Sequence, residues 1–259
     1  MTTNFVSKDC IQRLIKDVKD IIKNPLEDNG IYYKHDEEDM LKGYALIIGP
    51  SETPYFGGFY FFEFKYPTDY PYSPPKVKYY TNGEEIRFNP NLYKCGKVCI
   101  SILNTWSGDQ WTSSQTISTV LLNLCTLFCK NPLFNEPGIK KFHPDIVNYE
   151  KIIEYANLNI AVSDVVLSTS NFVKTDFSTE LNNLKINDFS FLSFFPFFQT
   201  IITDNFKKNV DLFLSFAEEK RNEYTETPLV KTGVYSMNVY IDYKKVIQKL
   251  EFLKKKMDL

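Results

Sequence analysis

The sequence contains only two histidines, His35 and His143, and neither belongs to a Cys-His-Asn signature of a cysteine protease. Its five cysteines are odd in number and lack the regular spacing of a disulfide framework. We find no apolar signal segment at the N-terminus, and the longest aromatic run, residues 189–202, is too short and too interrupted to span a bilayer. These absences argue against a base-activated peptidase, a secreted protein and a membrane protein. We expect a reducing compartment, the cytoplasm or also the nucleus.

Bulk composition narrows the class further. The net charge of −2 and the pI of about 5.8 argue against a dedicated nucleic-acid binder. A chain of 259 residues with 43% hydrophobic residues can bury a full core. This length predicts one domain with an extension, or two small domains. We see no internal repeat and no low-complexity linker.

The residue pattern of the first half of the chain predicts a helix followed by strands. Ser7 opens a helical pattern that Asn24-Pro25 ends. Its expected apolar face comprises Ile11, Leu14, Ile15, Val18, Ile21 and Ile22. Strand signals follow at residues 44–48, 59–66 and 76–80, and their short connections favour an antiparallel meander. Further helices are expected over residues 113–130 and 149–167.

The last third predicts a helical extension packed on the core. A polar stretch at residues 168–179 separates it from the preceding helix, and a charged turn is expected at residues 218–221. Two sets of apolar residues recur at helical spacing. The first is Phe206, Val210, Phe213, Leu214 and Ala217, and the second is Tyr243, Val246, Ile247, Leu250 and Leu253. Such stripes usually belong to a core, with a partner surface as the alternative. We therefore predict an α/β (α+β) core over residues 5–167 and the extension over residues 168–259.

The chemistry is expected in the stretch from Phe88 to Trp111. It holds Asn91 and Cys99, eight positions apart (99 minus 91). A thiol without a strong neighbouring base suits an acyl carrier, because exchange between thioesters needs only modest thiolate character. Attack by an amine would then build an oxyanion, for which the Asn91 amide is the candidate donor. The alternative is that Cys99 is a buried core thiol and Asn91 a turn residue.

The other cysteines have simpler explanations. Cys125 and Cys129, four apart on an expected helix, are interpreted as core thiols. Too few further ligands accompany them for zinc, so we expect no metal site. Cys95 lies in a bend beside Gly96, where it could be mistaken for the nucleophile or cross-link with Cys99.

Many separate motifs point to one family. They are Gly49-Pro50, Pro54-Tyr55-Phe56-Gly57-Gly58, Tyr66-Pro67, Tyr70-Pro71, Pro74-Pro75-Lys76-Val77, Asn89-Pro90-Asn91, Gly96-Lys97-Val98-Cys99-Ile100 and Trp111. In order and spacing, over about residues 5 to 165, the chain resembles the ubiquitin-conjugating enzymes, the E2 class. The resemblance implies an N-terminal helix, a four-stranded antiparallel meander sheet, a catalytic groove and C-terminal helices.

The resemblance also implies an activity and partners. Cys99 would accept ubiquitin or a ubiquitin-like protein as a thioester from an activating enzyme. It would pass the modifier to a lysine of a protein substrate, usually with a ubiquitin ligase. No cofactor is implied, because ATP is used only by the upstream activating enzyme.

The sequence departs from the common family pattern at two places. Asn89 stands where the family has a histidine that is mostly read as structural, which puts the rigidity of this loop in question. Trp111 lies twelve residues past Cys99 (111 minus 99), whereas most members have it eight past. The longer loop, the segment 131–138 and the C-terminal extension resemble a subgroup of large members typified by ubiquitin-conjugating enzyme Z.

Further site residues follow from the resemblance. An acidic residue near the groove would help to desolvate and deprotonate the incoming lysine. We rank Glu136 first, ahead of Asn135 and Asp109, with a solvated loop carboxylate as the alternative interpretation. The positions that match activating-enzyme and ligase contacts are Arg13, Lys16, Tyr72 and Ser113. Ser113-Ser114 replaces the usual Pro-Ala, so the choice of ligase is expected to differ.

Two competing hypotheses remain. The chain could be a non-catalytic variant of the same fold that only binds ubiquitin or scaffolds a partner. Such variants lack the nucleophile, whereas Cys99 and Asn91 are both present. A cysteine hydrolase is the second hypothesis, and the missing base argues against it.

Overall fold

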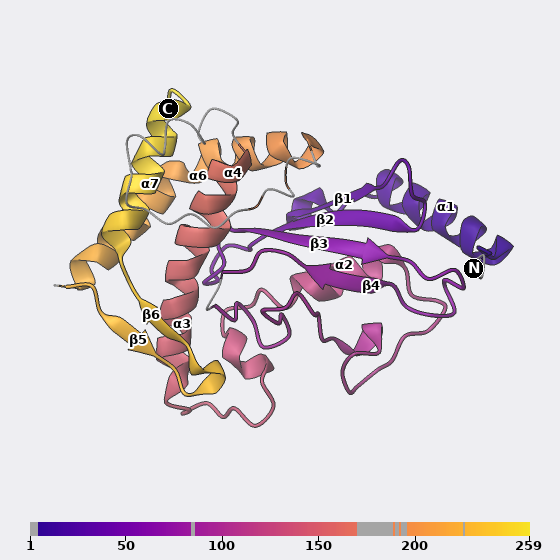
Figure 1. Ribbon diagram of the computed structural model, residues 1–259, viewed down its shortest axis with the longest axis horizontal. Coiled ribbons are helices and arrows are strands. Elements are labelled where there is room, and N and C mark those ends of the chain that lie inside the picture. The colour runs from indigo at the N-terminus through magenta and orange to yellow at the C-terminus, as the bar shows by residue number, and fades with distance from the viewer. Residues whose placement is uncertain (1–4, 84–85, 170–188, 190–191, 193–195, 225) are drawn as a thin grey trace.

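Four antiparallel strands form the centre of the molecule, in the order β1-β2-β3-β4. The computed structural model describes residues 5–83, 86–169, 189, 192, 196–224 and 226–259. The strands are β1 (Ile31–His35), β2 (Lys42–Ile48), β3 (Phe59–Lys65) and β4 (Lys76–Tyr79). Figure 1 shows the sheet with α1 beside it at one end and α3, α4, α6 and α7 at the other. The expected α/β fold and the meander are confirmed, although the residue pattern alone indicated β2, β3 and β4 but not β1.

Helix α1 (Lys8–Lys23) begins and ends where the sequence predicts. The Ser7 side chain caps it by accepting a hydrogen bond from the Cys10 backbone N–H at 3.0 Å. The predicted apolar face was partly wrong, because Ile15 and Ile22 are 48% and 74% exposed. The buried residues are Cys10, Leu14, Asp17 and Ile21.

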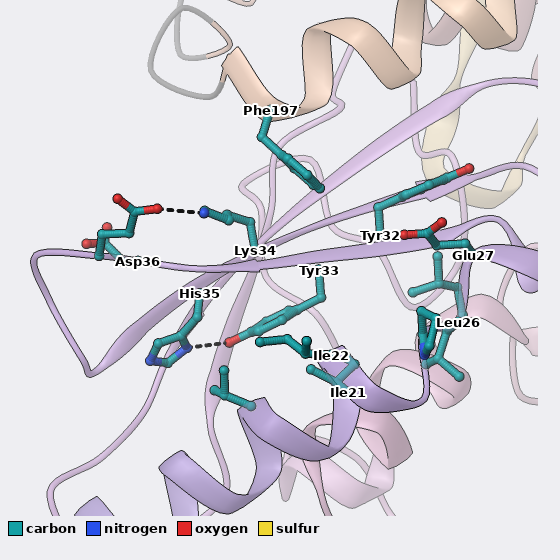
Figure 2. Close-up of a pocket in the computed structure, with 14 residues that line it drawn as sticks. Ile21, Ile22, Leu26, Glu27, Tyr32, Tyr33, Lys34, His35, Asp36 and Phe197 are labelled. Atoms are coloured by element: carbon teal, nitrogen blue, oxygen red, sulfur yellow. Dashed lines mark hydrogen bonds and ion pairs between the residues drawn. The ribbon is translucent and has the colours of Figure 1, made fainter.

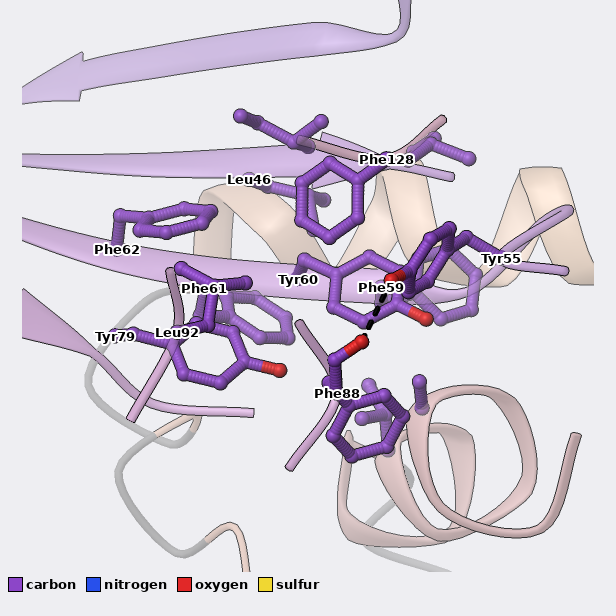
Figure 3. Packing of buried hydrophobic residues seen from close by; sticks show 14 of the residues in the cluster. Leu46, Tyr55, Phe59, Tyr60, Phe61, Phe62, Tyr79, Phe88, Leu92 and Phe128 are labelled. Atoms are coloured by element: carbon purple, nitrogen blue, oxygen red, sulfur yellow. Dashed lines mark hydrogen bonds between the residues drawn. The ribbon is translucent and has the colours of Figure 1, made fainter. Parts of the chain in front are cut away.

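Strand β3 is buried on both faces, which explains its nearly continuous aromatic sequence. On one face, Tyr60 stacks on Phe128 with ring centroids 4.3 Å apart (Figure 3). On the other, Phe61 meets Phe198 of α6 (Pro196–Glu223) at 6.1 Å. Part of the C-terminal segment therefore covers a face of the sheet.

The helices after the sheet differ in their bounds from the prediction. Helix α2 (Ile117–Cys125) starts after a capping box made by Thr116 and Thr119, so residues 113–116 and 126–130 of the predicted helix are not helical. Helix α3 (Asp145–Ala156) continues through a π-helical segment, η4 (Asn157–Asp164), into α4 (Val165–Thr169). The short 3-10 turns η1 (Glu27–Asn29), η2 (Ser101–Leu103) and η3 (Pro132–Asn135) lie in the connections of the core.

Helix α7 (Tyr243–Lys256) fixes the π-helical segment through a buried ion pair. Lys249 Nζ lies 2.6 Å from Asp164 Oδ1, and the two side chains are 2% and 0% exposed. The same ammonium donates to Asn159 Oδ1 at 2.7 Å. Because a π-helical segment leaves the regular hydrogen-bond ladder, this cation stabilises it from the adjacent helix.

The C-terminal segment is not purely helical. Strands β5 (Leu229–Lys231) and β6 (Asn238–Tyr240) form an antiparallel hairpin joined by the turn η6 (Val234–Ser236). In Figure 1 the hairpin runs alongside α3. The charged turn expected at residues 218–221 lies inside α6, so that prediction was wrong. The predicted domain boundary falls within α4, and residues 170–179 of the predicted polar joint lie outside the described residues.

Within the described part of the chain, no helix is both long enough and apolar enough to cross a membrane.

Candidate active site

Cys99 and Asn91 face each other across a short hairpin. The Cys99 N–H donates to the Asn91 carbonyl at 2.9 Å, and the Asn91 Nδ2 donates to the Cys99 carbonyl at 2.6 Å. The hairpin turns at residues 93–96, where Gly96 has φ +88° and a Cβ would meet the Tyr79 carbonyl at 2.8 Å. Glycine is needed there on both counts. An amide nitrogen has two N–H groups, so one of them remains for a ligand beside Cys99.

Asn89 makes this turn rigid, which answers the question raised by the missing histidine. Its Nδ2 donates to the Leu127 carbonyl at 2.8 Å, and its Oδ1 accepts from the Asn91 N–H at 2.9 Å. Tyr55 donates to the neighbouring Phe88 carbonyl at 2.6 Å (Figure 3). Asn89 is fully buried and so fixes the backbone that carries Asn91.

Cys99 is a buried residue that lies between two residues of the apolar core. Cys99 is 2% exposed, and its neighbours Val98 and Ile100 are part of the main hydrophobic cluster. Nearby, Thr105 Oγ1 donates to the Val98 carbonyl at 3.0 Å and accepts from the Ile100 N–H at 3.0 Å. The atoms that cover Cys99 must therefore move aside before another protein can reach its sulfur.

The remaining cysteines differ in their surroundings. Cys95 is exposed, and all five thiols are free. Burial raises the pKa of the thiols of Cys10, Cys125 and Cys129, so these groups stay protonated at neutral pH. The interpretation of Cys125 and Cys129 as core thiols on one helix was partly wrong, because both are only partly buried and α2 ends at Cys125.

Iodoacetamide is expected to modify Cys95 about tenfold faster than Cys99 in the native protein, because thiol reactivity follows access. Peptide mass spectrometry over time measures both rates in one sample. Cys10 serves as the control, since it is fully buried and should react only on unfolding. Equal rates at Cys95 and Cys99 would show that the cover over Cys99 opens freely.

The three candidates for the acidic position differ in their surroundings. Glu136 is half-buried and accepts a hydrogen bond from the Tyr235 hydroxyl. Asn135 Nδ2 reaches Asn89 Oδ1 at 3.5 Å, which places this loop against the turn that carries Asn91. Asp109 is exposed on the long loop. Asn135 therefore contacts the site turn directly, and Glu136 is connected to it through Tyr235 and Arg87.

Arg87 was missed by sequence reasoning. Its Nη2 donates to the Pro90 carbonyl at 2.5 Å and its Nε to the Asn89 carbonyl at 3.2 Å. The guanidinium lies between two rings, 3.5 Å from the centroid of Tyr93 and 4.6 Å from that of Tyr235. Only the nearness of Arg87 to the Asn-Pro-Asn motif could have drawn attention to it.

The predicted partner-binding residues lie on α1 and on the segments packed beside it. Arg13 Nη1 donates to the Ser113 carbonyl at 2.5 Å, and its Nη2 to Gln115 at 2.5 Å. Tyr72 is 65% exposed, and its hydroxyl donates at 3.0 Å to Asp9, which lies on α1 like Arg13. Lys16 is exposed. Arg13 thus also has a structural task, because it ties α1 to the segment before α2.

Arg13→Ala is expected to lower the free energy of unfolding by about 2 kcal/mol, the scale of hydrogen bonds made by a charged group. Arg13 also pairs with Asp17, whose side chain is 1% exposed, so the variant removes that partner too. Lys16→Ala, one turn further along the exposed side, is the matched control and should leave stability unchanged. Urea denaturation measures both, and equal stabilities would contradict the structural task of Arg13.

One hollow formed by described residues lies apart from Cys99. Figure 2 shows a cavity of about 490 Å³ between α1, β1 and the start of α6, lined by residues such as Ile22, Tyr33 and Phe197. The His35 ring there accepts or donates through Nδ1 to Tyr33 at 2.8 Å, and burial lowers its pKa. Among the described residues no three metal-ligating side chains gather.

Comparison with known proteins identifies the family. The family model described as ubiquitin-conjugating enzyme matches residues 13–155. Ubiquitin-conjugating enzyme E2 Z of Danio rerio is 45% identical over 163 residues, which cover 62% of this chain and 49% of the relative. The protein of the same name from Xenopus tropicalis is 37% identical over 203 residues, which cover 77% of this chain and 62% of the relative. That of Homo sapiens is 45% identical over 160 residues, which cover 61% of this chain and 45% of the relative.

The matches therefore span about half the length of these relatives, between 45% and 62%. Within the chain, the match includes the Asn89–Asn91 turn, Cys99 and Glu136, and covers more than half of the 259 residues. The chain belongs to the ubiquitin-conjugating enzyme family.

Proposed function

We propose that this protein carries ubiquitin or a ubiquitin-like protein as a thioester on Cys99 and transfers it to a lysine of a protein substrate. The observation that carries the proposal is the pairing of Cys99 with Asn91 on one hairpin, where the Asn91 amide donates to the Cys99 carbonyl and has a second N–H. An activating enzyme would supply the modifier at the expense of ATP, and a ligase would assist transfer. The enzyme itself needs no cofactor for this reaction.

The chemistry requires a thiol that stays reduced. All five cysteines are free, and Cys95 is exposed close in sequence to Cys99. We therefore also propose a reducing location, the cytoplasm or the nucleus.

A charging assay tests the proposal. The protein is incubated with ATP and a panel of activating enzymes, each with ubiquitin or its own ubiquitin-like modifier. Gel electrophoresis should show an adduct with one modifier, and a thiol reductant should cleave it. The experiment contradicts the proposal if every member of the panel leaves the protein unmodified.

The alternative is a binding module of the same fold without transfer activity, in which the thiol of Cys99, a residue only 2% exposed, stays closed. Such a module would bind a modifier in solution, measurable by calorimetry, yet form no thiol-sensitive adduct. The charging assay separates the two candidates.

A further inference from the structure

The turn of the C-terminal hairpin is held in an unusual conformation. Tyr235 and Ser236 have φ +64° and +49°, a region that non-glycine residues rarely occupy. Three hydrogen bonds impose this conformation. The Val234 N–H donates to Asp145 Oδ2 at 2.7 Å. Thr232 donates its N–H to the Met237 carbonyl at 3.0 Å and its Oγ1 hydroxyl to the Val234 carbonyl at 2.7 Å. Strained residues persist where the surroundings fix them, and they are concentrated at functional sites.

The strained turn aims Tyr235 at the site loops. Its hydroxyl donates to Glu136 Oε2, and its ring lies 4.6 Å from the Arg87 guanidinium. Burial and the bond to Glu136 raise the pKa of the Tyr235 hydroxyl, so it remains a proton donor. The other Glu136 oxygen, Oε1, takes no hydrogen bond or ion pair from any residue that the structure describes.

The same hairpin also holds Arg87 at its backbone. The Arg87 N–H donates to the Met237 sulfur at 3.3 Å, and Met237 is fully buried. Tyr149 of α3 donates to the Arg87 carbonyl at 2.6 Å. Because Arg87 in turn binds the carbonyls of Asn89 and Pro90, the hairpin is connected to the turn that carries Asn91.

We propose that the C-terminal hairpin is a working part of the transfer site, with Tyr235 as a positioning residue for Glu136 and, through Arg87, for the Asn91 turn. This inference rests on the proposed function. Tyr235 would hold one carboxylate oxygen of Glu136, which leaves the other to receive the ammonium of an incoming lysine.

The reaction step conserves its atoms and charges. The lysine ammonium gives one proton to Glu136, and the neutral amine attacks the thioester carbonyl carbon. A C–N bond forms and the C–S bond breaks, so Cys99 Sγ leaves with the electron pair as a thiolate. The second surplus proton of the nitrogen passes to this thiolate, and Glu136 returns its proton to water.

Tyr235→Phe keeps the ring on Arg87 and removes only the hydroxyl. The enzyme is first charged, ATP is then removed, and discharge to free lysine is followed at several concentrations and pH values. We expect normal charging and about tenfold slower discharge at neutral pH, the loss expected for one hydrogen bond to a charged group. The deficit should narrow as the pH approaches the lysine pKa of about 10.4, because the amine then needs no base.

Three further variants make the test specific. Tyr240→Phe is the matched control, since Tyr240 lies on the same hairpin and is 64% exposed. Glu136→Gln, which leaves the hairpin untouched, should reproduce the pH profile of Tyr235→Phe. The double variant should discharge no more slowly than Glu136→Gln alone, because both changes act through one carboxylate.

The outcomes separate the two proposals. Suppose that the wild-type protein charges and that Tyr235→Phe discharges at the same rate as Tyr240→Phe at every pH. This result would overturn the role of the hairpin but leave the proposed function standing. A deficit that does not change with pH, or that adds to that of Glu136→Gln, would also overturn it. A wild type that never charges would overturn both proposals.

Discussion

Replacing Cys99 with alanine is expected to abolish the thiol-sensitive adduct completely. The thioester bond is made by the Cys99 sulfur, and alanine offers no atom that could replace it. Cys95→Ala should charge at the wild-type rate, although Cys95 is the more exposed thiol of the same hairpin. The pair is a matched control, because both variants remove one thiol from residues 95–99.

Cys99→Ser gives a second, independent signature. A serine oxygen at this position would form an oxygen ester, which resists thiol reductants but is cleaved by hydroxide. Gel electrophoresis with and without each reagent distinguishes the two bonds. If the adduct survives in Cys99→Ala and disappears in Cys95→Ala, the site lies at Cys95 and the acyl-carrier role of Cys99 is wrong.

The second large effect is expected at Asn91. Asn91→Ala should slow discharge to lysine by about 10²-fold or more, the usual consequence of removing one oxyanion donor. Charging should be much less affected, because exchange between two thioesters is nearly isoenergetic. Single-turnover discharge of the charged enzyme, measured beside the rate of charging, gives both quantities.

The structure requires a control for the structural contact of Asn91. Its amide also binds the Cys99 carbonyl at 2.6 Å, so its loss could disturb the hairpin itself. Asn123→Ala removes a comparable amide, whose Nδ2 donates to the Thr119 carbonyl at 2.9 Å on α2, away from Cys99. If Asn91→Ala impairs charging, discharge and thermal stability in proportion, Asn91 only supports the loop and donates nothing to the oxyanion.

The sequence was most informative where one residue decides a local structure. Ser7 caps α1, and Asn91 and Cys99 lie together because the Asn-Pro-Asn turn and Gly96 close a short hairpin. Periodicity failed at α1, because the buried Asp17 is paired with Arg13 and receives a hydrogen bond from Tyr70. An apolar-face rule excludes such a carboxylate and counts Ile15 and Ile22 instead.

Short elements and long-range contacts escaped the sequence reasoning. Strands β5 and β6 have three residues each, too few for an alternation to stand out. Tyr235 lies 99 residues from Glu136 and is brought to it only when the hairpin packs beside α3. No local pattern marks Tyr235, so its place in the site depends on tertiary structure.

The burial of β3 on both sides has a consequence for anyone who wishes to shorten the protein. A fragment that ended near residue 167 would leave Phe61 facing water in place of Phe198, and Asp164 without the Lys249 ammonium. We expect such a fragment to aggregate, although the family model matches only residues 13–155. The extent of the family model and the extent of the autonomous folding unit thus differ in this chain.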